Sequence, residues 1–315
     1  MRDAPRPLPW PRLAGLLALA LCLAFADTPP AGAKPGRGET ARPVLIYDYP
    51  PGQALPIHFR LADGGPKGDP GQAALRLSGS SQFDAPGLDN LARFLPGPLT
   101  VVDLRQESHG FLNGRPVSWF SPQDRANAGK TPAQAAADER ARLRRLSDTA
   151  TAAVTVILAK NARGGIGESE RLAVDVTDVV DEAKLAADRG LSSLRLYVPD
   201  HMAPDAAQVD RFVAYCRAMA PGTWLHVHCH AGDGRTTTFM VLYALLNNPG
   251  GESLEAIAAK QAAAGGIDLL GNPPTGWKRA MYLARADFLR QFAAYAAANP
   301  GGAPLTFRQW RAAAR

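Results

Sequence analysis

Three short runs of apolar and β-branched residues, each ending in polar residues, are spaced along the chain. They read LTVVDLR (99–105), LRLYVPD (194–200) and WLHVHC (224–229). Continuous apolar runs of this length, without strict alternation of apolar and polar positions, are typical of strands buried on both faces. We therefore predict that these segments are strands of a parallel sheet.

Segments with helical periodicity separate and follow these strands, and capping residues or glycines mark several of their ends. The alternation of strands and helices predicts an α/β fold with a central, mainly parallel sheet flanked by helices. The predicted helices lie in six segments: 84–95, 178–190, 203–220, 235–248, 252–266 and 275–299.

The pattern changes between the first and second predicted strands. A helix capped by Thr131, with Pro132 in its first turn, is followed by two β-branched runs joined by a turn at Gly164 and Gly165. We predict a small β-rich insertion over residues 113–178. It would divide an α/β core into a first part, 43–112, and a second part, 179–315.

The first 26 residues have a different character. Three arginines precede an apolar run of 14 residues that ends in Ala24-Phe25-Ala26, a small-x-small sequence. This arrangement is typical of a cleaved secretory signal peptide, and the run is short for a membrane span. We expect export to the periplasm or beyond, with no stable membrane association after cleavage; an uncleaved anchor is the alternative. Residues 27–42 are rich in Pro and Gly and predict a flexible leader.

Composition and charge narrow the classes of function. The chain is 46% hydrophobic and 20% charged, as in ordinary globular proteins. Loss of the signal peptide removes three Arg and one Asp, which lowers the formal charge from +6 to +4. A mildly basic protein suits an anionic ligand but lacks the strong basic character of a nucleic-acid-binding protein. Only Cys216 and Cys229 follow the signal peptide. Two cysteines exclude a disulfide-built scaffold but leave a single pair open.

The segment WLHVHCHAGDGRTTTF (224–239) carries the candidate chemistry. A strand that ends at Cys229, a Gly-containing loop and a helix that starts near Arg235 surround a concavity with backbone N–H groups, which favour an anion. Gly232 and Gly234 allow the amides to point inward. The nucleotide-binding loop ends in Gly-Lys-Ser/Thr, whereas here Arg235 offers a planar fork to two phosphate oxygens. The same field favours a thiolate at Cys229, which we predict to be a nucleophile.

The sequence HCHAGDGRTT resembles the His-Cys-x5-Arg-Thr-Thr loop of the cysteine phytases, the protein-tyrosine-phosphatase-like inositol polyphosphate phosphatases. Stretches 76–83, 101–119, 198–201 and 277–285 also resemble that family. The resemblance implies a phosphatase-like α/β core with a small β-barrel-like domain. It also implies metal-free and cofactor-free hydrolysis of inositol polyphosphates such as phytate through a cysteinyl-phosphate on Cys229, with Arg235 and the loop amides holding the phosphate.

Asp200 is the predicted general acid. It follows a predicted strand, and ligands of parallel sheets bind beyond the carboxyl ends of the strands, where Asp103, Asp200 and Cys229 are expected to converge. It also matches the Asp-His loop of the family. The alternatives are that Asp200 caps a turn and that Asp205 is the acid. By resemblance, Thr236 steadies the thiolate; a helix-capping role is the alternative.

A further set of residues is expected to contact substrate. Lys278, Tyr282 and Arg285 share one helix face, and the resemblance implies that this face binds ring phosphates, although such spacing is also common on solvated helices. The family often has Lys where this chain has Arg285. The remaining predicted contacts, which come from the resemblance and from the loop itself, are Arg60, His201, His228, His230, Ala231, Gly232, Asp233 and Gly234.

Several alternatives remain open at the level of sequence. His226, His228 and His230 alternate as zinc ligands on one strand face do, which would suit a zinc hydrolase. His226 is otherwise expected to be a core residue.

The segment 103–107 has two interpretations. A buried structural network that involves Asp103, Arg105 and Glu107 is at least as well supported as contact of these residues with substrate. A protein-tyrosine or phosphoinositide phosphatase, or a non-catalytic phosphate-binding module, would use the same loop. The sequence does not predict an oligomeric state.

Overall fold

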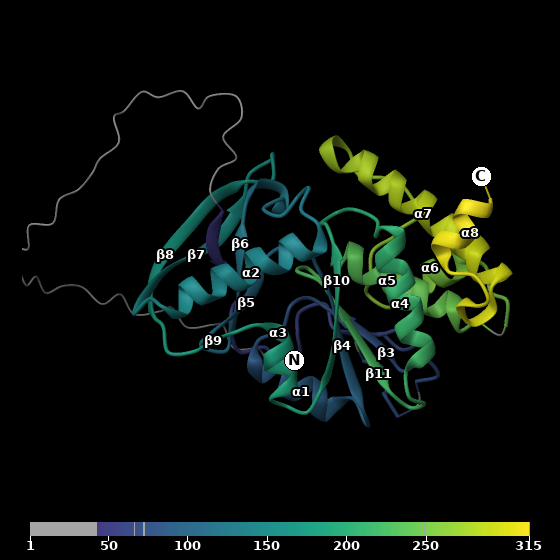
Figure 1. Ribbon diagram of the computed structural model, residues 1–315, viewed down its shortest axis with the longest axis horizontal. Coiled ribbons are helices and arrows are strands. Elements are labelled where there is room, and N and C mark those ends of the chain that lie inside the picture. Colours follow the sequence, from purple (N-terminus) through teal and green to yellow (C-terminus); the bar gives the residue numbers. More distant parts are fainter. Residues whose placement is uncertain (1–42, 66, 72, 249, 315) are drawn as a thin grey trace, which may run out of the picture. The chain divides into compact units, whose positions relative to one another are not determined.

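The computed structural model describes residues 43–314, apart from 66, 72 and 249. The predicted signal peptide and leader lie outside these residues. Two sheets organise the described chain (Figure 1). The first sheet has the strand order β10 (Ser192–Val198), β4 (Leu99–Arg105), β11 (Trp224–His228), β3 (Leu77–Ser80) and β2 (Arg60–Leu61).

The first sheet confirms the predicted α/β core. β10, β4, β11 and β3 are parallel, and the short β2 adds an antiparallel edge. Every residue of β4 and β11 is buried, which explains why their sequences are continuous apolar runs. β3 is a strand that the apolar pattern does not predict, because its sequence is LSGS.

Eight helices lie among the described residues: α1 (Ala85–Phe94), α2 (Pro132–Ser147), α3 (Glu182–Ala187), α4 (Ala206–Ala218), α5 (Gly234–Leu246), α6 (Leu254–Ala263), α7 (Arg279–Ala298) and α8 (Phe307–Ala313). Three short 3-10 turns are η1 (Pro122–Asp124), η2 (Gly276–Lys278) and η3 (Pro300–Gly302). None of the helices in the described part of the chain is long and apolar enough to cross a membrane.

The helices cover both faces of the first sheet. Apolar residues of α4 to α8 form one core with β4, β10 and β11, and those of α1 and α3 form a second core on the other face. α5 is buried at 11 of its 13 positions, because it packs on the sheet and is itself covered by α6 and α7. α5, which follows the predicted loop, therefore lies at the centre of the core that α4 to α8 form with the sheet.

The second sheet has the order β8 (Ile166–Asp175), β7 (Thr151–Lys160), β1 (Val44–Tyr47), β6 (Arg115–Phe120), β5 (His109–Leu112) and β9 (Val179–Val180). The predicted hairpin around Gly164 is present as β7 and β8. β1, β5 and β9 lie outside 113–178, so the predicted boundaries cut through this sheet. The strand order is linear from β8 to β9, and the barrel-like closure implied by the resemblance is not confirmed.

Candidate active site

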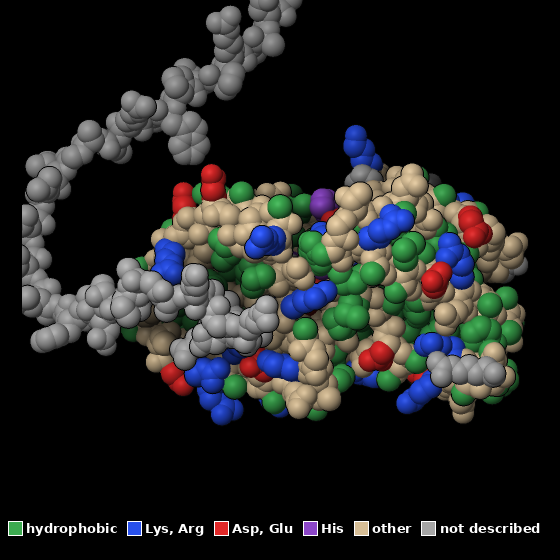
Figure 2. Space-filling model, turned by 90° about the horizontal axis from the view of Figure 1, so that it is seen from above, with side chains coloured by type: hydrophobic (Ala, Val, Ile, Leu, Met, Phe, Trp, Pro, Cys, Tyr) green, Lys and Arg blue, Asp and Glu red, His purple; other side chains and the backbone are tan. Residues whose placement is uncertain are grey.

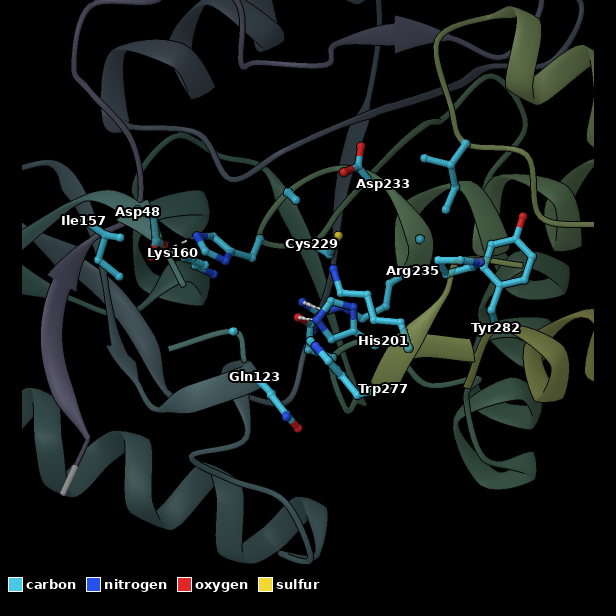
Figure 3. Close-up of a pocket in the computed structure, with 18 of the residues that line it drawn as sticks. Asp48, Gln123, Ile157, Lys160, His201, Cys229, Asp233, Arg235, Trp277 and Tyr282 are labelled. Atoms are coloured by element: carbon cyan, nitrogen blue, oxygen red, sulfur yellow. Dashed lines mark ion pairs between the residues drawn. The ribbon is translucent and has the colours of Figure 1, made fainter. Parts of the chain in front are cut away.

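The loop that joins β11 to α5 lies at the carboxyl edge of the first sheet. Residue His228, the last of β11, pairs in register with Asp103 on one side and Ser80 on the other, and Cys229 follows it directly. Cys229 lies at the centre of a cavity of about 770 Å³ (Figure 3). The strand order of the sheet thus places the cysteine where ligands of parallel sheets bind.

Close packing around the loop explains both of its glycines. Gly232 has φ +78°, and a Cβ at this position would lie 2.5 Å from the backbone nitrogen of Ser81. A Cβ on Gly234 would lie 2.5 Å from Nη1 of Arg285. Gly232 therefore permits the turn against β3, while Gly234 allows a guanidinium to lie directly on the loop.

The N-terminus of α5 is left without a side-chain cap. The N-cap residue Asp233 makes no side-chain hydrogen bond to the helix, whereas α1, α2, α3, α4, α6 and α8 are all capped by Asp, Ser or Thr side chains. The first N–H groups of α5, beside Cys229, therefore remain available to an anion.

Thr236 lies behind the cysteine and not in the cavity. Its Oγ1 donates a hydrogen bond to Sγ of Cys229 at 3.2 Å, and both residues are buried. The sulfur thus has a hydroxyl donor on the side away from the cavity. This contact matches the predicted steadying role more closely than a helix-capping role.

Arg235 is fixed by a bidentate ion pair. Its Nη1 and Nη2 donate to the two carboxylate oxygens of Glu107 at 2.7 and 2.8 Å, and Nη1 also donates to the carbonyl of Val198. Burial alone would raise the pKa of Glu107, but Arg235 and Arg105 lower it well below its usual range. The Nε–H group of Arg235 has no hydrogen-bond partner among the described residues, and so remains a donor for a ligand.

Asp200 lies in the cavity beside Arg235. Its Oδ1 is 2.9 Å from Nη2 of Arg235, and its Oδ2 is 2.9 Å from Nε2 of His201. Burial would raise the pKa of Asp200, but Arg235 and His201 hold it well below its usual range. Asp205, the alternative acid, is instead the N-cap of α4. Asp103 does not line the cavity, so the predicted convergence holds for Asp200 and Cys229 alone.

Two different walls enclose the rest of the cavity. Figure 3 shows Ile157 and Lys160 of β7 on one side of Cys229 and Tyr282 of α7 on the other. The predicted residues that line the cavity are Asp200, His201, Cys229, His230, Ala231, Asp233, Gly234, Arg235, Lys278, Tyr282 and Arg285. No motif marks the lining residues of β1 and β7, or Trp277, whose ring meets that of His201 edge-on with centroids 4.9 Å apart.

Three predicted substrate contacts lie outside the cavity. The guanidinium of Arg60 is buried and donates to the carbonyl of Gly232 and to Oγ1 of Thr237, both at 3.0 Å. Gly232 itself turns toward β3. His228 is fully buried and pairs with Glu182 at 2.6 Å. Arg60 thus holds the loop through Gly232 and Thr237, whereas His228 is paired in the core. The expected contacts of these three residues with substrate stay predictions.

The three alternating histidines have separate partners. His226 is bound between the hydroxyls of Ser78 and Ser80, at 2.9 and 3.0 Å, as expected of a core residue. His228 pairs with Glu182, whereas His230 lies 3.6 Å from a carboxylate oxygen of Asp48. They do not converge on one point, so this geometry does not favour the zinc alternative. Cys216 and Cys229 are both free thiols, which excludes a disulfide between them.

A buried charge network lies beneath the site. Arg105 bridges Asp48 and Glu107, as the structural interpretation of that segment predicted. The sequence reasoning missed its other members, His109, Glu139, Glu182 and Arg195, because their pairings join distant segments.

Comparison with known proteins identifies the family. The sequence model of PTP-like phytases, described by the words inositol hexakisphosphate, matches residues 102–247. The solved structure of a PTP-like phytase from Bdellovibrio bacteriovorus is 33% identical, with a TM-score of 0.68, over 86% of this chain and 95% of that one. The chain belongs to the PTP-like phytase family.

Two further comparisons extend over part of larger proteins. A tandemly repeated PTP-like phytase from Mitsuokella multacida is 29% identical with a TM-score of 0.75, over 88% of this chain and 50% of that one. The effector protein hopD2 of Pseudomonas syringae pv. tomato is 33% identical over 220 residues, which is 69% of this chain and 46% of hopD2. The chain thus spans about half the length of these two relatives, one of which is itself a PTP-like phytase.

Proposed function

We propose that the protein is a phosphoric monoester hydrolase that removes phosphate from myo-inositol polyphosphates, phytate among them. The observation that carries the proposal is Cys229, held by the hydroxyl of Thr236 between an uncapped helix N-terminus and Arg235. Support for the substrate comes from the family and from a PTP-like myo-inositol phosphatase of Mitsuokella multacida. Its structure is a complex with myo-inositol-(1,3,4,5)-tetrakisphosphate, and it is 28% identical to this chain with a TM-score of 0.75.

In the first step, the thiolate of Cys229 attacks phosphorus. The new S–P bond forms as the bond from phosphorus to the ring oxygen breaks, which leaves a cysteinyl-phosphate and an alkoxide. The amides at the start of α5 and the guanidinium of Arg235 hold the equatorial oxygens, where negative charge is concentrated during transfer.

Asp200 supplies the proton to the alkoxide. In the described arrangement it is paired with Arg235 and has a depressed pKa. A phosphate in the loop competes for the same guanidinium, which weakens this pairing and raises the pKa of Asp200 toward the range in which it carries a proton. In the second step, water attacks phosphorus, the carboxylate of Asp200 takes the proton, and Cys229 leaves as a thiolate.

Measurement of phosphate release tests the proposal. The purified protein should release phosphate from phytate faster than from a phosphotyrosine peptide, and a chelator should leave the rate unchanged. Cys229→Ser should abolish release, whereas the matched control Cys216→Ser should retain it, because Cys216 lies away from the cavity on α4. Preference for the peptide would favour a protein phosphatase. Activity that survives Cys229→Ser would overturn the mechanism.

Export is a separate proposal that rests on the sequence of residues 1–26. The arginines, apolar run and Ala-x-Ala end favour a cleaved signal peptide. Cell fractionation with mass spectrometry of the mature N-terminus tests it. Full-length protein in the cytoplasm would contradict it.

A further inference from the structure

Trp277 lines the cavity but has no part in the reaction steps proposed above. It lies in η2, is partly exposed, and its ring meets that of His201 edge-on with centroids 4.9 Å apart. Nε2 of His201 in turn lies 2.9 Å from Oδ2 of Asp200. Figure 3 shows His201 and Trp277 together below Cys229. A continuous set of contacts therefore leads from Trp277 to the general acid.

The second sheet also approaches Trp277. A Cβ on Gly164, in the turn between β7 and β8, would lie 3.3 Å from Cζ2 of Trp277. This turn is fixed to η1, because the backbone nitrogen of Gln123 donates to the carbonyl of Gly164 at 2.9 Å. The guanidinium of Arg125 lies 5.9 Å from the centroid of the Trp277 ring. Neighbours from several segments thus restrict rotation of the indole away from His201.

The backbone at His201 has a conformation that requires support. Its φ is +62°, in the left-handed region that a non-glycine residue seldom adopts unless its surroundings hold it there. The backbone nitrogen of Met202 donates to the carbonyl of Pro199 at 3.2 Å, which closes the turn but leaves the direction of the imidazole unset. The edge-on contact with Trp277 therefore sets the direction in which the imidazole leaves the turn.

The two oxygens of the Asp200 carboxylate have different neighbours. Oδ1 lies 2.9 Å from Nη2 of Arg235, whereas Oδ2 lies 2.9 Å from Nε2 of His201. When a phosphate in the loop competes for the guanidinium, Oδ1 loses its cation while His201 still holds Oδ2. The proton that the leaving group requires then belongs on Oδ1, the oxygen on the side of the loop. The orientation of the carboxyl group thus depends on the imidazole and, through it, on Trp277.

A role for Trp277 in an apolar docking surface fits its surroundings less well. Two cations lie near its ring, Arg125 at 5.9 Å and Lys278 at 5.2 Å from the centroid. Figure 2 shows hydrophobic side chains beside Lys and Arg on the face seen there. A ring that already has cations for neighbours is a poor centre for apolar burial. The contact with His201 instead directs attention inward, to the acid.

We propose that Trp277 is a positioning residue for the general acid: it holds His201 against Asp200, so that the protonated oxygen faces the leaving group. Trp277 acts through His201 and does not touch the reacting atoms. The turn at Gly164 supports the indole, which gives the second sheet a part in proton transfer. This inference rests on the proposed function and adds to it a residue that acts through the acid.

The test compares two leaving groups. In Trp277→Ala, kcat for phytate should fall about tenfold, because a displaced catalytic group loses much of its contribution. For p-nitrophenyl phosphate, kcat should change by less than about twofold, since its leaving group departs without a proton. KM for phytate should stay within about twofold. Trp277→Leu, which keeps apolar bulk, should show the same difference between substrates, and Trp277→Phe, which keeps an aromatic ring, should retain most of the activity.

The matched control is Trp310→Ala, which removes a partly exposed tryptophan of α8 away from the cavity lining. It should leave kcat for both substrates unchanged. Equal losses for the two substrates in the Trp277 variants would indicate a general effect on the fold or on Cys229, and would overturn the inference. A higher KM with unchanged kcat would make Trp277 a substrate contact, which also overturns it.

A double-mutant cycle separates positioning of Asp200 from any other role. In the Asp200→Asn background the acid is absent, so Trp277→Ala should lower kcat for phytate by less than about twofold further. A further tenfold loss would contradict the inference and leave the proposed function intact. Absence of phosphate release from inositol phosphates by the wild-type protein would instead overturn the proposed function, and the inference with it.

Discussion

The sulfur of Cys229 depends on one neighbouring hydroxyl. Replacing Thr236 with Val keeps the shape of the side chain but removes the 3.2 Å donor. We expect alkylation of Cys229 by iodoacetate at neutral pH to slow by about tenfold, since a hydrogen bond to a charged group contributes about 1.5–3 kcal/mol. Thr238→Val on the same helix removes a hydroxyl that bonds only to the carbonyl of Gly234 in the described structure. Equal rates in both variants would refute the role of Thr236.

The role of Asp200 has a measurable pH dependence. Its proton is required by the leaving group, so activity should fall as pH rises and the acid in the substrate complex deprotonates. Asp200→Asn should lower kcat for inositol phosphates by about 10²–10⁴ and remove this basic limb of the profile. The loss should be smaller for p-nitrophenyl phosphate, whose leaving group needs no proton. A basic limb that persists in Asp200→Asn would assign the acid to another group.

For single residues, the sequence placed Cys229 and Arg235 together but did not predict the buried residues that hold the loop and the sheet edge in place. Cys229 and Arg235 are separated by a short, Gly-containing segment, so local spacing was sufficient to place them together. Glu107 is 128 positions from Arg235, and Glu182 is 46 positions from His228. No local pattern reports such pairings, and the hydrogen bonds of Arg60 to Gly232 and Thr237 were not predicted for the same reason.

The loop between β11 and α5 depends on the absence of a side chain at Gly232. Gly232→Ala would place a methyl group against the backbone of β3 in a left-handed conformation. We expect at least a tenfold loss of activity and a lower Tm. Gly222→Ala provides a matched control, since its φ is +81° and no atom lies within 4 Å of the added carbon. Equal losses in the two variants would show that conformation alone, and not the close approach, governs this position.

Elements with strong periodicity were predicted almost to the residue. The run 99–105 coincides with β4, the predicted segment 203–220 contains α4, and the segment 235–248 covers α5 apart from Gly234. β3 was missed because a strand of small polar residues has no apolar pattern. The limits of the second sheet were misplaced because β1 joins it from a point about 100 residues before β7, a pairing that local sequence does not specify.

The two sheets are joined by the buried network around His109. This residue of β5 lies 3.2 Å from Asp103 of β4, while Arg195 of β10 contacts Glu139 of α2. Burial would lower the pKa of His109, but Asp103 raises it to about 10. The imidazolium on the second sheet therefore lies among acidic groups of β4, α2 and α3, which it holds together.

The raised pKa of His109 gives stability a defined pH dependence. A folded-state pKa above the unfolded value near 6.5 means that the contribution is complete below pH 6.5 and is lost as pH rises toward 10. The slope should reach about 1.4 kcal/mol per pH unit. Chemical denaturation between pH 6 and 10 measures it. His109→Gln should be less stable at pH 6 and show a flatter profile, whereas exposed His58→Gln should match the wild type. Parallel profiles for His109→Gln and wild type would contradict this role.

The shared guanidinium of Arg235 has a consequence for affinity. Because Asp200 and an incoming anion compete for it, occupancy of the loop should draw a proton from solution onto the carboxyl group. Inhibitory oxyanions whose own charge is constant should then bind more tightly as the medium becomes more acidic. Calorimetry in buffers with different ionisation enthalpies would register this uptake, which Asp200→Asn should eliminate. Without ligand, Asp200 would thus be deprotonated. A phosphorylated ligand would itself bring about the protonation of Asp200 that its cleavage requires.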